Sequence, residues 1–325
     1  MSSPTERLAA TVAHLSPLSF SASSSPQFLV KNIAVFGAGL MGTGIAQVSA
    51  QSGYKVVLCD IGQDLVEKGL DDIIKSWAKA AQRMFNDNPL KQDQYVRDLR
   101  SRIKTTTDPE QAAEDADLVI EAVIENLKIK QELLSTVDKA AKKSCLLATN
   151  TSSLSVTDIG AMLSDERKKH FGGLHFFNRD TKMQLLEIIR TKDTSDATFN
   201  AFIDYGRNIK KTAVACKDTP GFIVNRLLVP YLRDAILMLE RGDASAEDID
   251  TAMKLGAGYP MGPLELADLV GLDTAKRIVD AWRERMEKTE DPTIPKEMLK
   301  SSELLDQLVS AKKLGRKTGE GFFKY

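Results

Sequence analysis

The sequence predicts an α/β protein in which a doubly wound parallel sheet precedes an all-helical domain. Between residues 29 and 217, short β-branched runs alternate with stretches of helical period, which is typical of parallel strands covered by helices. From Phe222 onward only helical period is found, and Lys217-Asp-Thr-Pro-Gly221 is a turn pattern between the two parts. We therefore expect a tail over 1–28, an α/β domain over 29–217 and an all-helical domain over 218–325.

Composition and charge narrow the class of protein. The chain has 325 residues with 42% hydrophobic and 27% charged residues, as expected for a globular protein of one or two domains. A net charge of −1 provides no bulk attraction to nucleic acid, and no apolar run approaches the roughly 18–20 residues that span a bilayer. Cys59, Cys145 and Cys216 form no metal-ligand pattern, so we expect reduced, buried thiols and no metal site.

Residues 1–28 differ from the rest of the chain. They hold eight serines but only one arginine, Arg7, and one acid, Glu6. A mitochondrial transit peptide is Ser-rich, poor in acids, Arg-rich and amphipathic. The segment meets the first two conditions and is weak on the third, so a targeting segment and a disordered linker both remain open.

The first predicted strand leads into a glycine-rich turn. Phe28 to Phe36 is predicted to be a strand, and the turn that follows it opens a helix. This turn contains Gly37, Gly39, Leu40, Met41 and Gly42. The next strand ends in Asp60, eighteen residues after the last glycine, which is the context that G-x-G-x-x-G requires in a Rossmann-like dinucleotide site. The glycines would let a pyrophosphate approach the helix N-terminus, although a purely structural turn is the alternative.

Asp60 bears on the choice of cofactor. Its carboxylate would accept hydrogen bonds from the adenosine ribose hydroxyls and repel a 2′-phosphate. Ile61-Gly62-Gln63 supplies no arginine to receive such a phosphate. The sequence therefore favours NAD over NADP.

Strands and helices continue to alternate up to residue 217. Residues 65–85 have helical period and place Lys75, Lys79 and Arg83 on one face, a pattern that is usually a solvated surface. The strand 116–123 precedes Glu125 and a helix over 126–142. The strand 144–149 runs into Asn150-Thr-Ser152-Ser153. Ligands bind beyond the carboxyl ends of such strands, so these polar residues are candidates for orienting a nicotinamide and a substrate, with plain helix caps as the alternative.

His175 and Glu187 are the strongest candidates for chemistry. The chain has three histidines, and only His175 lies in an apolar, strand-like run. If 178–182 turn a hairpin, the midpoint falls at Thr181, and His175 would lie opposite Glu187 with Cβ atoms roughly 4.5–5.5 Å apart. A carboxylate there fixes the tautomer and stabilises imidazolium, which makes a general base. A structural polar pair is the alternative.

The helical part has recognisable boundaries. A long apolar helix is predicted from Phe222 to Arg241, and Ser245-Ala-Glu-Asp248 resembles a capping box for the next helix. Gly256 to Pro263 breaks the chain, and further helices are predicted to about Lys313.

Several long motifs, in order, resemble the L-3-hydroxyacyl-CoA dehydrogenase family over residues 29–325. They are Val35-Phe-Gly-Ala-Gly-Leu-Met-Gly42, Glu121-Ala-Val-Ile-Glu-Asn126, Thr149-Asn-Thr-Ser-Ser153, Gly173-Leu-His-Phe-Phe-Asn178, Lys217-Asp-Thr-Pro-Gly-Phe-Ile-Val-Asn-Arg226, Arg241-Gly-Asp-Ala-Ser through Pro263, and Lys317-Thr-Gly-Glu-Gly-Phe322. The resemblance implies NAD-dependent oxidation of L-3-hydroxyacyl-CoA in fatty-acid β-oxidation. It also implies a homodimer joined through the helical domain, and it favours the mitochondrial matrix over the cytoplasm.

The resemblance also implies roles for individual residues. His175 would be the base with Glu187 as its partner, and Ser152 and Asn225 would line the substrate site. The cofactor would contact Gly37, Gly39, Leu40, Met41, Gly42, Asp60, Glu125, Lys130, Asn150 and Ser152. A helical hairpin inserted in the NAD-binding domain would contact CoA near Lys75, Ser76, Lys79 and Arg83.

One departure from the family and two rival functions remain. The family has Pro-Val-Pro after Asn178, where this chain has Arg179-Asp-Thr181, which puts the substrate range in doubt. A relative acting on a free sugar acid such as L-gulonate would not need the basic stripe. A non-catalytic NAD-binding protein, as in eye-lens crystallin relatives, would not need the His175–Glu187 pair.

Overall fold

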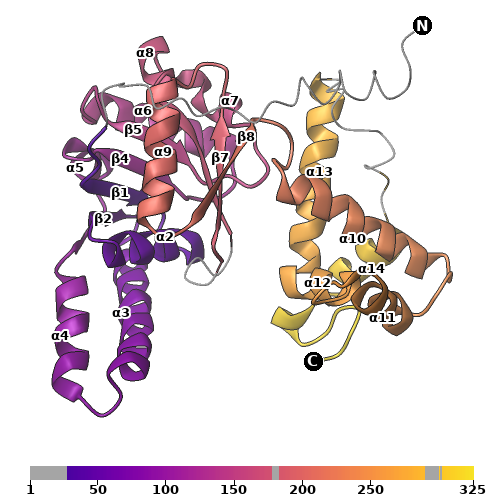
Figure 1. Ribbon diagram of the computed structural model, residues 1–325. Coiled ribbons are helices and arrows are strands. Elements are labelled where there is room, and N and C mark those ends of the chain that lie inside the picture. The colour runs from indigo at the N-terminus through magenta and orange to yellow at the C-terminus, as the bar shows by residue number, and fades with distance from the viewer. Residues whose placement is uncertain (1–27, 178–182, 290–299, 301) are drawn as a thin grey trace, which may run out of the picture.

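The computed structural model describes residues 28–177, 183–289, 300 and 302–325. Figure 1 shows two lobes, an α/β lobe with a long helical hairpin projecting from it and a lobe made of helices. Among the described residues, no helix is long and apolar enough to cross a membrane.

A single eight-stranded sheet forms the centre of the α/β lobe, in the order β3-β2-β1-β4-β5-β6-β7-β8. The strands are β1 (Asn32–Phe36), β2 (Lys55–Cys59), β3 (Ile103–Thr106), β4 (Leu118–Glu121), β5 (Leu146–Thr149), β6 (Phe171–Phe176), β7 (Leu185–Arg190) and β8 (Thr212–Lys217). All neighbouring strands pair in parallel except β6 and β7, which pair antiparallel. The strand order reverses between β1 and β4, which is where such sheets bind dinucleotides.

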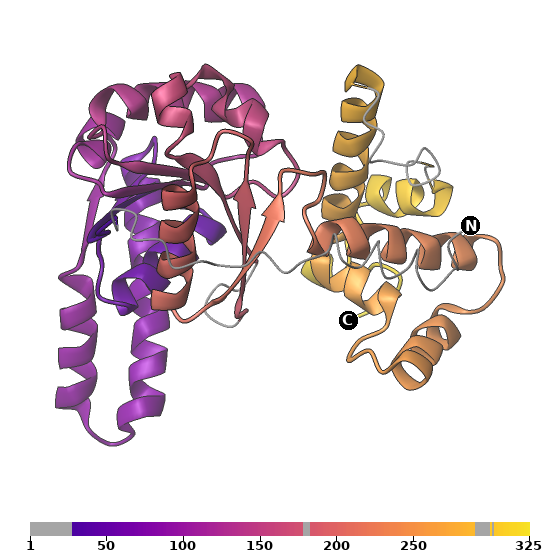
Figure 2. The same cartoon turned by 45° about the horizontal axis from the view of Figure 1, so that its top comes forward.

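Helices cover both faces of this sheet (Figure 2), and the strands are therefore buried on both sides. Ile33 and Val35 of β1 pack into one core cluster with α2 (Leu40–Gln51), α3 (Gln63–Phe85) and α9 (Asp196–Asn208). Ala34 and Phe36 point the other way, into a cluster with α5 (Pro109–Glu114), α6 (Leu127–Ala140) and α7 (Val156–Ile159). This period of two is the pleat of a strand.

The hairpin consists of α3 and α4 (Pro89–Arg100), joined by a short turn. Pro89 and the Asn88 side chain, which accepts a hydrogen bond from the amide of Lys91, begin the second helix. Residue periodicity predicted only the first of these helices, and the hairpin itself was implied by the family resemblance. The first strand begins at Asn32 rather than at Phe28.

The helical lobe is built on α10 (Val224–Glu240), which packs against α12, α13 and α14. Its helices are α10, α11 (Ala246–Ala257), α12 (Pro263–Val270), α13 (Leu272–Thr289) and α14 (Glu303–Ser310). Ser245 caps α11 through the amide of Asp248, as its sequence pattern predicted. β8 ends at Lys217 and α10 begins at Val224, so the two lobes are joined by a short turn.

Candidate active site

The glycine turn after β1 brings the backbone of two strands and a helix together. Gly37 has a φ of +101°, and a Cβ there would lie 2.5 Å from the carbonyl oxygen of Ala122 after β4. A Cβ on Gly42 would lie 1.7 Å from the carbonyl oxygen of Gly37. Around Gly39, by contrast, an added Cβ would meet nothing within 4 Å. The turn is therefore tightly packed at Gly37 and Gly42, and there is open space beside Gly39.

The open side of this turn fits a pyrophosphate. Gly39 is the N-cap of α2, and no side chain caps this helix end. The first amides of a helix carry partial positive charge and need an acceptor. A dinucleotide phosphate placed beside Gly39, Leu40 and Met41 would supply that acceptor.

Asp60 lies beside the same turn, just after β2. Its Oδ2 accepts a hydrogen bond from the amide of Ala38 at 2.6 Å, and its Oδ1 accepts one from the amide of Ile61 at 2.7 Å. These bonds hold the carboxylate at the edge of the sheet while leaving lone pairs for ribose hydroxyls. Ile61 is 93% exposed and the next residues bring no positive charge, so the structure supplies nothing there to hold a 2′-phosphate.

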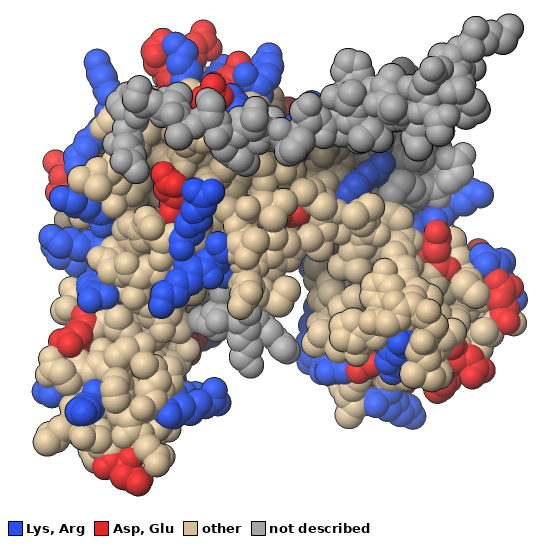
Figure 3. Space-filling model, viewed as in Figure 1, with Lys and Arg blue, Asp and Glu red and all other residues tan. Residues whose placement is uncertain are grey.

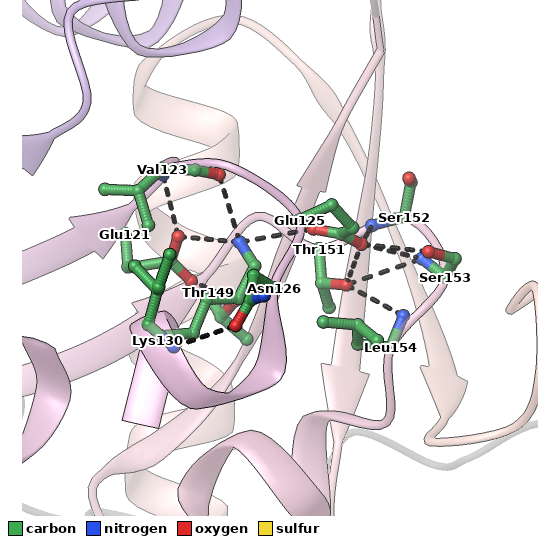
Figure 4. A network of polar contacts seen from close by, with 11 residues as sticks. Glu121, Val123, Glu125, Asn126, Lys130, Thr149, Thr151, Ser152, Ser153 and Leu154 are labelled. Carbon is green, nitrogen blue, oxygen red and sulfur yellow. Dashed lines mark hydrogen bonds and ion pairs between the residues drawn. The ribbon is translucent and has the colours of Figure 1, made fainter. Parts of the chain in front are cut away.

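A buried ion network lies under the ends of β4 and β5 (Figure 4). The Lys130 ammonium lies 2.7 Å from Oε1 of Glu121 and 3.2 Å from Oε2 of Glu125, and it also donates to the carbonyl of Val123 at 3.3 Å. Thr149 donates to the other oxygen of Glu121 at 2.6 Å. Lys130 and Glu121 are both almost fully buried, so each charge depends on the other for compensation.

Glu125 connects this network to the loop after β5. Its Oε1 accepts hydrogen bonds from the hydroxyl of Thr151 at 2.5 Å and from the amides of Ser152 and Ser153 at 3.1 and 3.2 Å. Burial alone would raise the pKa of Glu125, but the Lys130 ammonium and the hydroxyl donors outweigh burial and hold that pKa below its usual value. Glu125 therefore carries a negative charge that fixes the 151–153 segment.

Lys130 itself lies one layer below the surface, with 1% of its area exposed. All three ammonium protons have acceptors in the network described above. The structure thus places Lys130 under Glu125 rather than at the open edge, where the resemblance put it as a cofactor contact.

The loop after β5 also connects to β6 and to the helical lobe. Asn150 accepts a hydrogen bond from the amide of Phe176 at 2.8 Å, at the end of the strand that carries His175. Asn225, near the start of α10, donates its side-chain amide to the carbonyl of Ser152 at 3.3 Å. Asn150, Ser152 and Asn225 therefore meet at the carboxyl edge of the sheet.

His175 and Glu187 lie directly opposite each other on β6 and β7, as the hairpin spacing predicted. Nδ1 of His175 lies 2.7 Å from Oε2 of Glu187, and the two residues are 4% and 0% exposed. With the carboxylate ionised, Nδ1 donates the hydrogen bond and Nε2 is left unprotonated on the opposite side of the ring. Residues 178–182, which include Arg179 to Thr181 and the predicted hairpin turn, lie outside the described residues.

The second oxygen of Glu187 is bound by the helical lobe. Oε1 accepts hydrogen bonds from the amides of Ile223 and Val224, at 3.1 and 2.9 Å, at the start of α10. Three donors and the positive end of a helix thus surround a carboxylate with no exposed surface.

The basic stripe of α3 is exposed to solvent, unlike the buried His175–Glu187 pair. Lys75, Lys79 and Arg83 are all exposed, and the ammonium of Lys75 lies 3.9 Å from Asp72 in a weak surface pair. Ser76 is half-buried and accepts a hydrogen bond from the Gln47 side chain at 3.0 Å, which ties α3 to α2. Figure 3 shows basic side chains on the side of the hairpin that faces the open recess between the two lobes.

The three cysteines are thiols that stay protonated at neutral pH. Burial raises the pKa of each thiol, at Cys59, Cys145 and Cys216, to about 12. Cys216 is half-buried rather than buried as expected. Within the described ranges, no group of three or more His, Cys, Asp or Glu residues could hold a metal ion.

Sequence reasoning missed several residues around the site. Glu121, Thr149 and Asp218 lie in segments that resemble family motifs, but the sequence assigned no role to any of the three. Asp218 accepts hydrogen bonds from the hydroxyl of Ser155 and the amides of Val156 and Thr157, at 2.8, 3.0 and 2.8 Å. A lone acid at the end of an apolar strand, such as Glu121, is the signal that could have revealed this network.

A Rossmann-like sheet with an uncapped glycine turn, an acid after β2 and a buried His–Glu pair defines an NAD-dependent dehydrogenase. Comparison with known families agrees. The model of the 3-hydroxyacyl-CoA dehydrogenase NAD binding domain matches residues 32–219, and the model of the C-terminal domain matches residues 221–325. The chain belongs to the 3-hydroxyacyl-CoA dehydrogenase family, and it is an NAD-dependent enzyme of that family.

Individual relatives match over nearly the whole chain. A probable 3-hydroxyacyl-CoA dehydrogenase of Caenorhabditis elegans is 52% identical over 91% of this chain and 93% of its own length. The mitochondrial hydroxyacyl-coenzyme A dehydrogenase of Homo sapiens is 49% identical over 96% of each chain. The crystal structure of (S)-3-hydroxybutyryl-CoA dehydrogenase from Ralstonia eutropha has a TM-score of 0.81 and 35% identity, covering 91% of this chain and 99% of that one.

Proposed function

We propose that this protein oxidises L-3-hydroxyacyl-CoA to 3-ketoacyl-CoA in fatty-acid β-oxidation, with His175 as the general base. The observation that carries the proposal is the 2.7 Å contact between Nδ1 of His175 and the buried Glu187 carboxylate. A polar pair that served only the fold would not need an imidazole, whose second ring nitrogen can accept a proton. The names of the relatives supply the substrate class.

The residues divide the reaction between them. Nε2 of His175 removes the proton of the C3 hydroxyl, and the charge of Glu187 stabilises the imidazolium that forms. Ser152 and Asn225 hydrogen-bond the C3 oxygen and hold it toward the imidazole. Bound NAD⁺ would supply the acceptor for the hydride that leaves C3, and the products would then be 3-ketoacyl-CoA, NADH and a proton.

Binding of the two ligands rests on separate parts of the chain. The Gly37–Gly42 turn, Asp60, Glu125 and Asn150 hold the cofactor along the carboxyl edge of the sheet. Lys130 acts beneath them by holding Glu125. The exposed stripe of Lys75, Lys79 and Arg83, with Ser76, attracts the phosphates of CoA.

The test is a substrate comparison with the purified protein. NADH oxidation is followed with acetoacetyl-CoA, with longer 3-ketoacyl-CoA esters and with dehydrogulonate. We expect turnover with the CoA esters and none above background with the sugar acid. Turnover confined to dehydrogulonate would reassign the enzyme to free sugar acids, and no turnover with either class would favour a non-catalytic NAD-binding protein.

We also propose that the protein is a homodimer joined through its helical lobe. This lobe carries large apolar side chains on its surface, including Leu227, Met238 and Leu255, which are 70%, 39% and 83% exposed. Large exposed apolar side chains are the kind of surface that an interface would cover. Sedimentation velocity should give twice the chain mass of 35.7 kDa, and a monomer at micromolar concentration would contradict the proposal.

The mitochondrial matrix is the location that we propose. Support comes from the relatives named mitochondrial and from the Ser-rich, acid-poor residues 1–28. Incubation of the full chain with isolated mitochondria should produce a protease-protected protein. A chain that stays outside and protease-sensitive would indicate a cytoplasmic enzyme.

A further inference from the structure

The imidazole of His175 is held between two aromatic rings. Its ring centroid lies 4.6 Å from that of Phe177 and 5.4 Å from that of Phe222, with interplanar angles of 52° and 57°. Phe177 lies directly after the end of the strand that carries His175 and is half-buried, whereas Phe222 comes from the turn between the lobes and is 5% exposed. The hydrogen bond to Glu187 fixes Nδ1, but a single bond leaves the plane of the ring free to tilt. The two flanking rings limit that tilt.

Phe222 has an unusual backbone conformation. Its φ is +52°, and it follows Gly221, whose φ is +78°. Glycine adopts this left-handed region without steric cost, but a side chain with a Cβ atom does not. A bulky residue in such a conformation is a strained position that its surroundings must enforce. Phenylalanine at this position therefore suggests that the ring contributes something that glycine could not.

The surrounding contacts explain why the strain persists. The amide of Phe222 donates to the carbonyl of Thr219 at 2.9 Å, and the next two amides donate to Glu187. On its other side the turn presses against α13, because a Cβ on Gly221 would lie 2.3 Å from the Trp282 ring. The turn that directs two amides at Glu187 thus also directs the Phe222 ring at His175.

The beginning of the turn is anchored independently. The Asp218 carboxylate binds the hydroxyl of Ser155 and the amides of Val156 and Thr157, just past the loop that carries Asn150 and Ser152. Phe222 itself packs into the core cluster that contains Val156 and Phe171 of the α/β lobe. The ring therefore has little room to move away from His175.

We propose that Phe222 is a positioning residue that holds the imidazole plane of His175 for proton transfer. The proposal rests on the proposed role of His175 as the base. Loss of the ring should let the imidazole tilt while Glu187 still holds Nδ1. Small misplacements of a reacting group lower the rate of the chemical step without weakening cofactor binding, because the nucleotide contacts lie on other loops.

The test uses Phe222→Leu, with Phe171→Leu as a matched control from the same core cluster. Phe171 is 2% exposed, and the edge of its ring lies against Gly160. We expect Phe222→Leu to lower kcat for acetoacetyl-CoA about 10- to 100-fold, with KM for NADH unchanged within about twofold. Phe171→Leu should keep kcat near the wild-type value when both are assayed well below their unfolding temperatures. Phe222→Met replaces Phe222→Leu if the latter does not fold.

A spectroscopic measurement separates positioning from loss of packing. The chain has only three histidines, so ring-labelled histidine gives few NMR signals. The His175 signal should shift and broaden in Phe222→Leu and stay in place in Phe171→Leu. Equal losses of kcat in the two variants, or wild-type kcat in Phe222→Leu, would overturn the proposal. His175→Gln is assayed in parallel, since an active His175→Gln enzyme would instead overturn the role of His175.

Discussion

The buried polar pairs and the basic stripe of α3 use charge in opposite ways. His175 and Glu187 are 4% and 0% exposed, and hydrogen bonds hold Nδ1 of His175 and both carboxylate oxygens of Glu187. The side chain of Lys75 in the stripe is 70% exposed and has only a 3.9 Å surface pair. Proton transfer needs a group held at a fixed distance, whereas attraction of a phosphate needs only a positive field. The contrast fits the proposed division, in which the buried pair serves chemistry and the stripe serves substrate capture.

The sharpest contrast lies within one helix. Lys130 and Lys128 are two residues apart on α6, but Lys130 is buried against Glu121 and Glu125, and Lys128 has an exposed 3.8 Å pair with Glu132. Lys130→Met leaves two carboxylates uncompensated and should lower the free energy of unfolding by about 3–5 kcal/mol. Lys128→Met should change it by no more than about 0.5 kcal/mol. Urea denaturation of both variants measures the difference, and equal values would show that burial of Lys130 has no consequence.

The second-largest effect is expected at Glu187, whose carboxylate binds both His175 and the amides at the start of α10. Glu187→Gln removes the counter-charge of the imidazolium and presents an NH₂ group toward either His175 or the amides of α10. We expect kcat with acetoacetyl-CoA to fall about 100-fold or more, and thermal unfolding at a lower temperature. Steady-state kinetics and a melting curve provide the check. An enzyme that kept its kcat would show that the buried charge does not support the base.

Asp60 is intermediate between the buried His175–Glu187 pair and the exposed stripe. It is half-buried and accepts hydrogen bonds from two backbone amides. Asp60→Ala should raise KM for NADH about tenfold through loss of a charged acceptor. It should also reduce the preference of the enzyme for NADH over NADPH. Asp64→Ala, in the exposed first turn of α3, is the matched control and should leave both constants unchanged. A wild-type enzyme that already prefers NADPH would contradict this role of Asp60.

The smallest effect is expected at the stripe. Reversal of Lys79 and Arg83 to Glu should raise KM for acetoacetyl-CoA and leave KM for NADH near its starting value. The difference should shrink with added salt, since exposed charges are screened over about 8–10 Å at 0.10–0.15 M ionic strength. An acetoacetyl-pantetheine thioester, which lacks the nucleotide, should be nearly insensitive to the change.

The control for the stripe has the same change of net charge elsewhere. Lys139→Glu with Lys143→Glu alters two exposed lysines near the end of α6, away from the carboxyl edge of the sheet. This variant should keep both KM values. If it and the α3 variant raised KM equally, the effect would come from overall charge, and the stripe would be an ordinary solvated surface.

Local patterns in the sequence predicted much of the site. The apolar, strand-like runs around His175 and Glu187 and their twelve-residue spacing were enough to place the two residues opposite each other. The strand–glycine–helix order likewise predicted the turn at Gly37 to Gly42, because this geometry depends on residues close in the chain. Such local rules also predicted the alternation of strands and helices.

Contacts between distant segments could not be predicted in this way. Lys130 lies on an amphipathic helix, where a lysine is ordinarily solvated, and its burial depends on how α6 meets the ends of β4 and β5. The left-handed conformation of Phe222 could not be predicted either, since the sequence favours glycine for that region. This conformation results from three sets of contacts that act on the same turn, namely those with Glu187, those of Asp218 and those with α13.

The central claim is that His175 performs the chemistry and takes no part in holding the nucleotide. His175→Gln, assayed for acetoacetyl-CoA reduction and titrated with NADH by fluorescence in the same preparation, tests it most directly. We expect a loss of turnover of about 10²–10⁴-fold with the dissociation constant for NADH unchanged. Near-wild-type turnover in that variant, or loss of NADH binding in parallel with turnover, would contradict it.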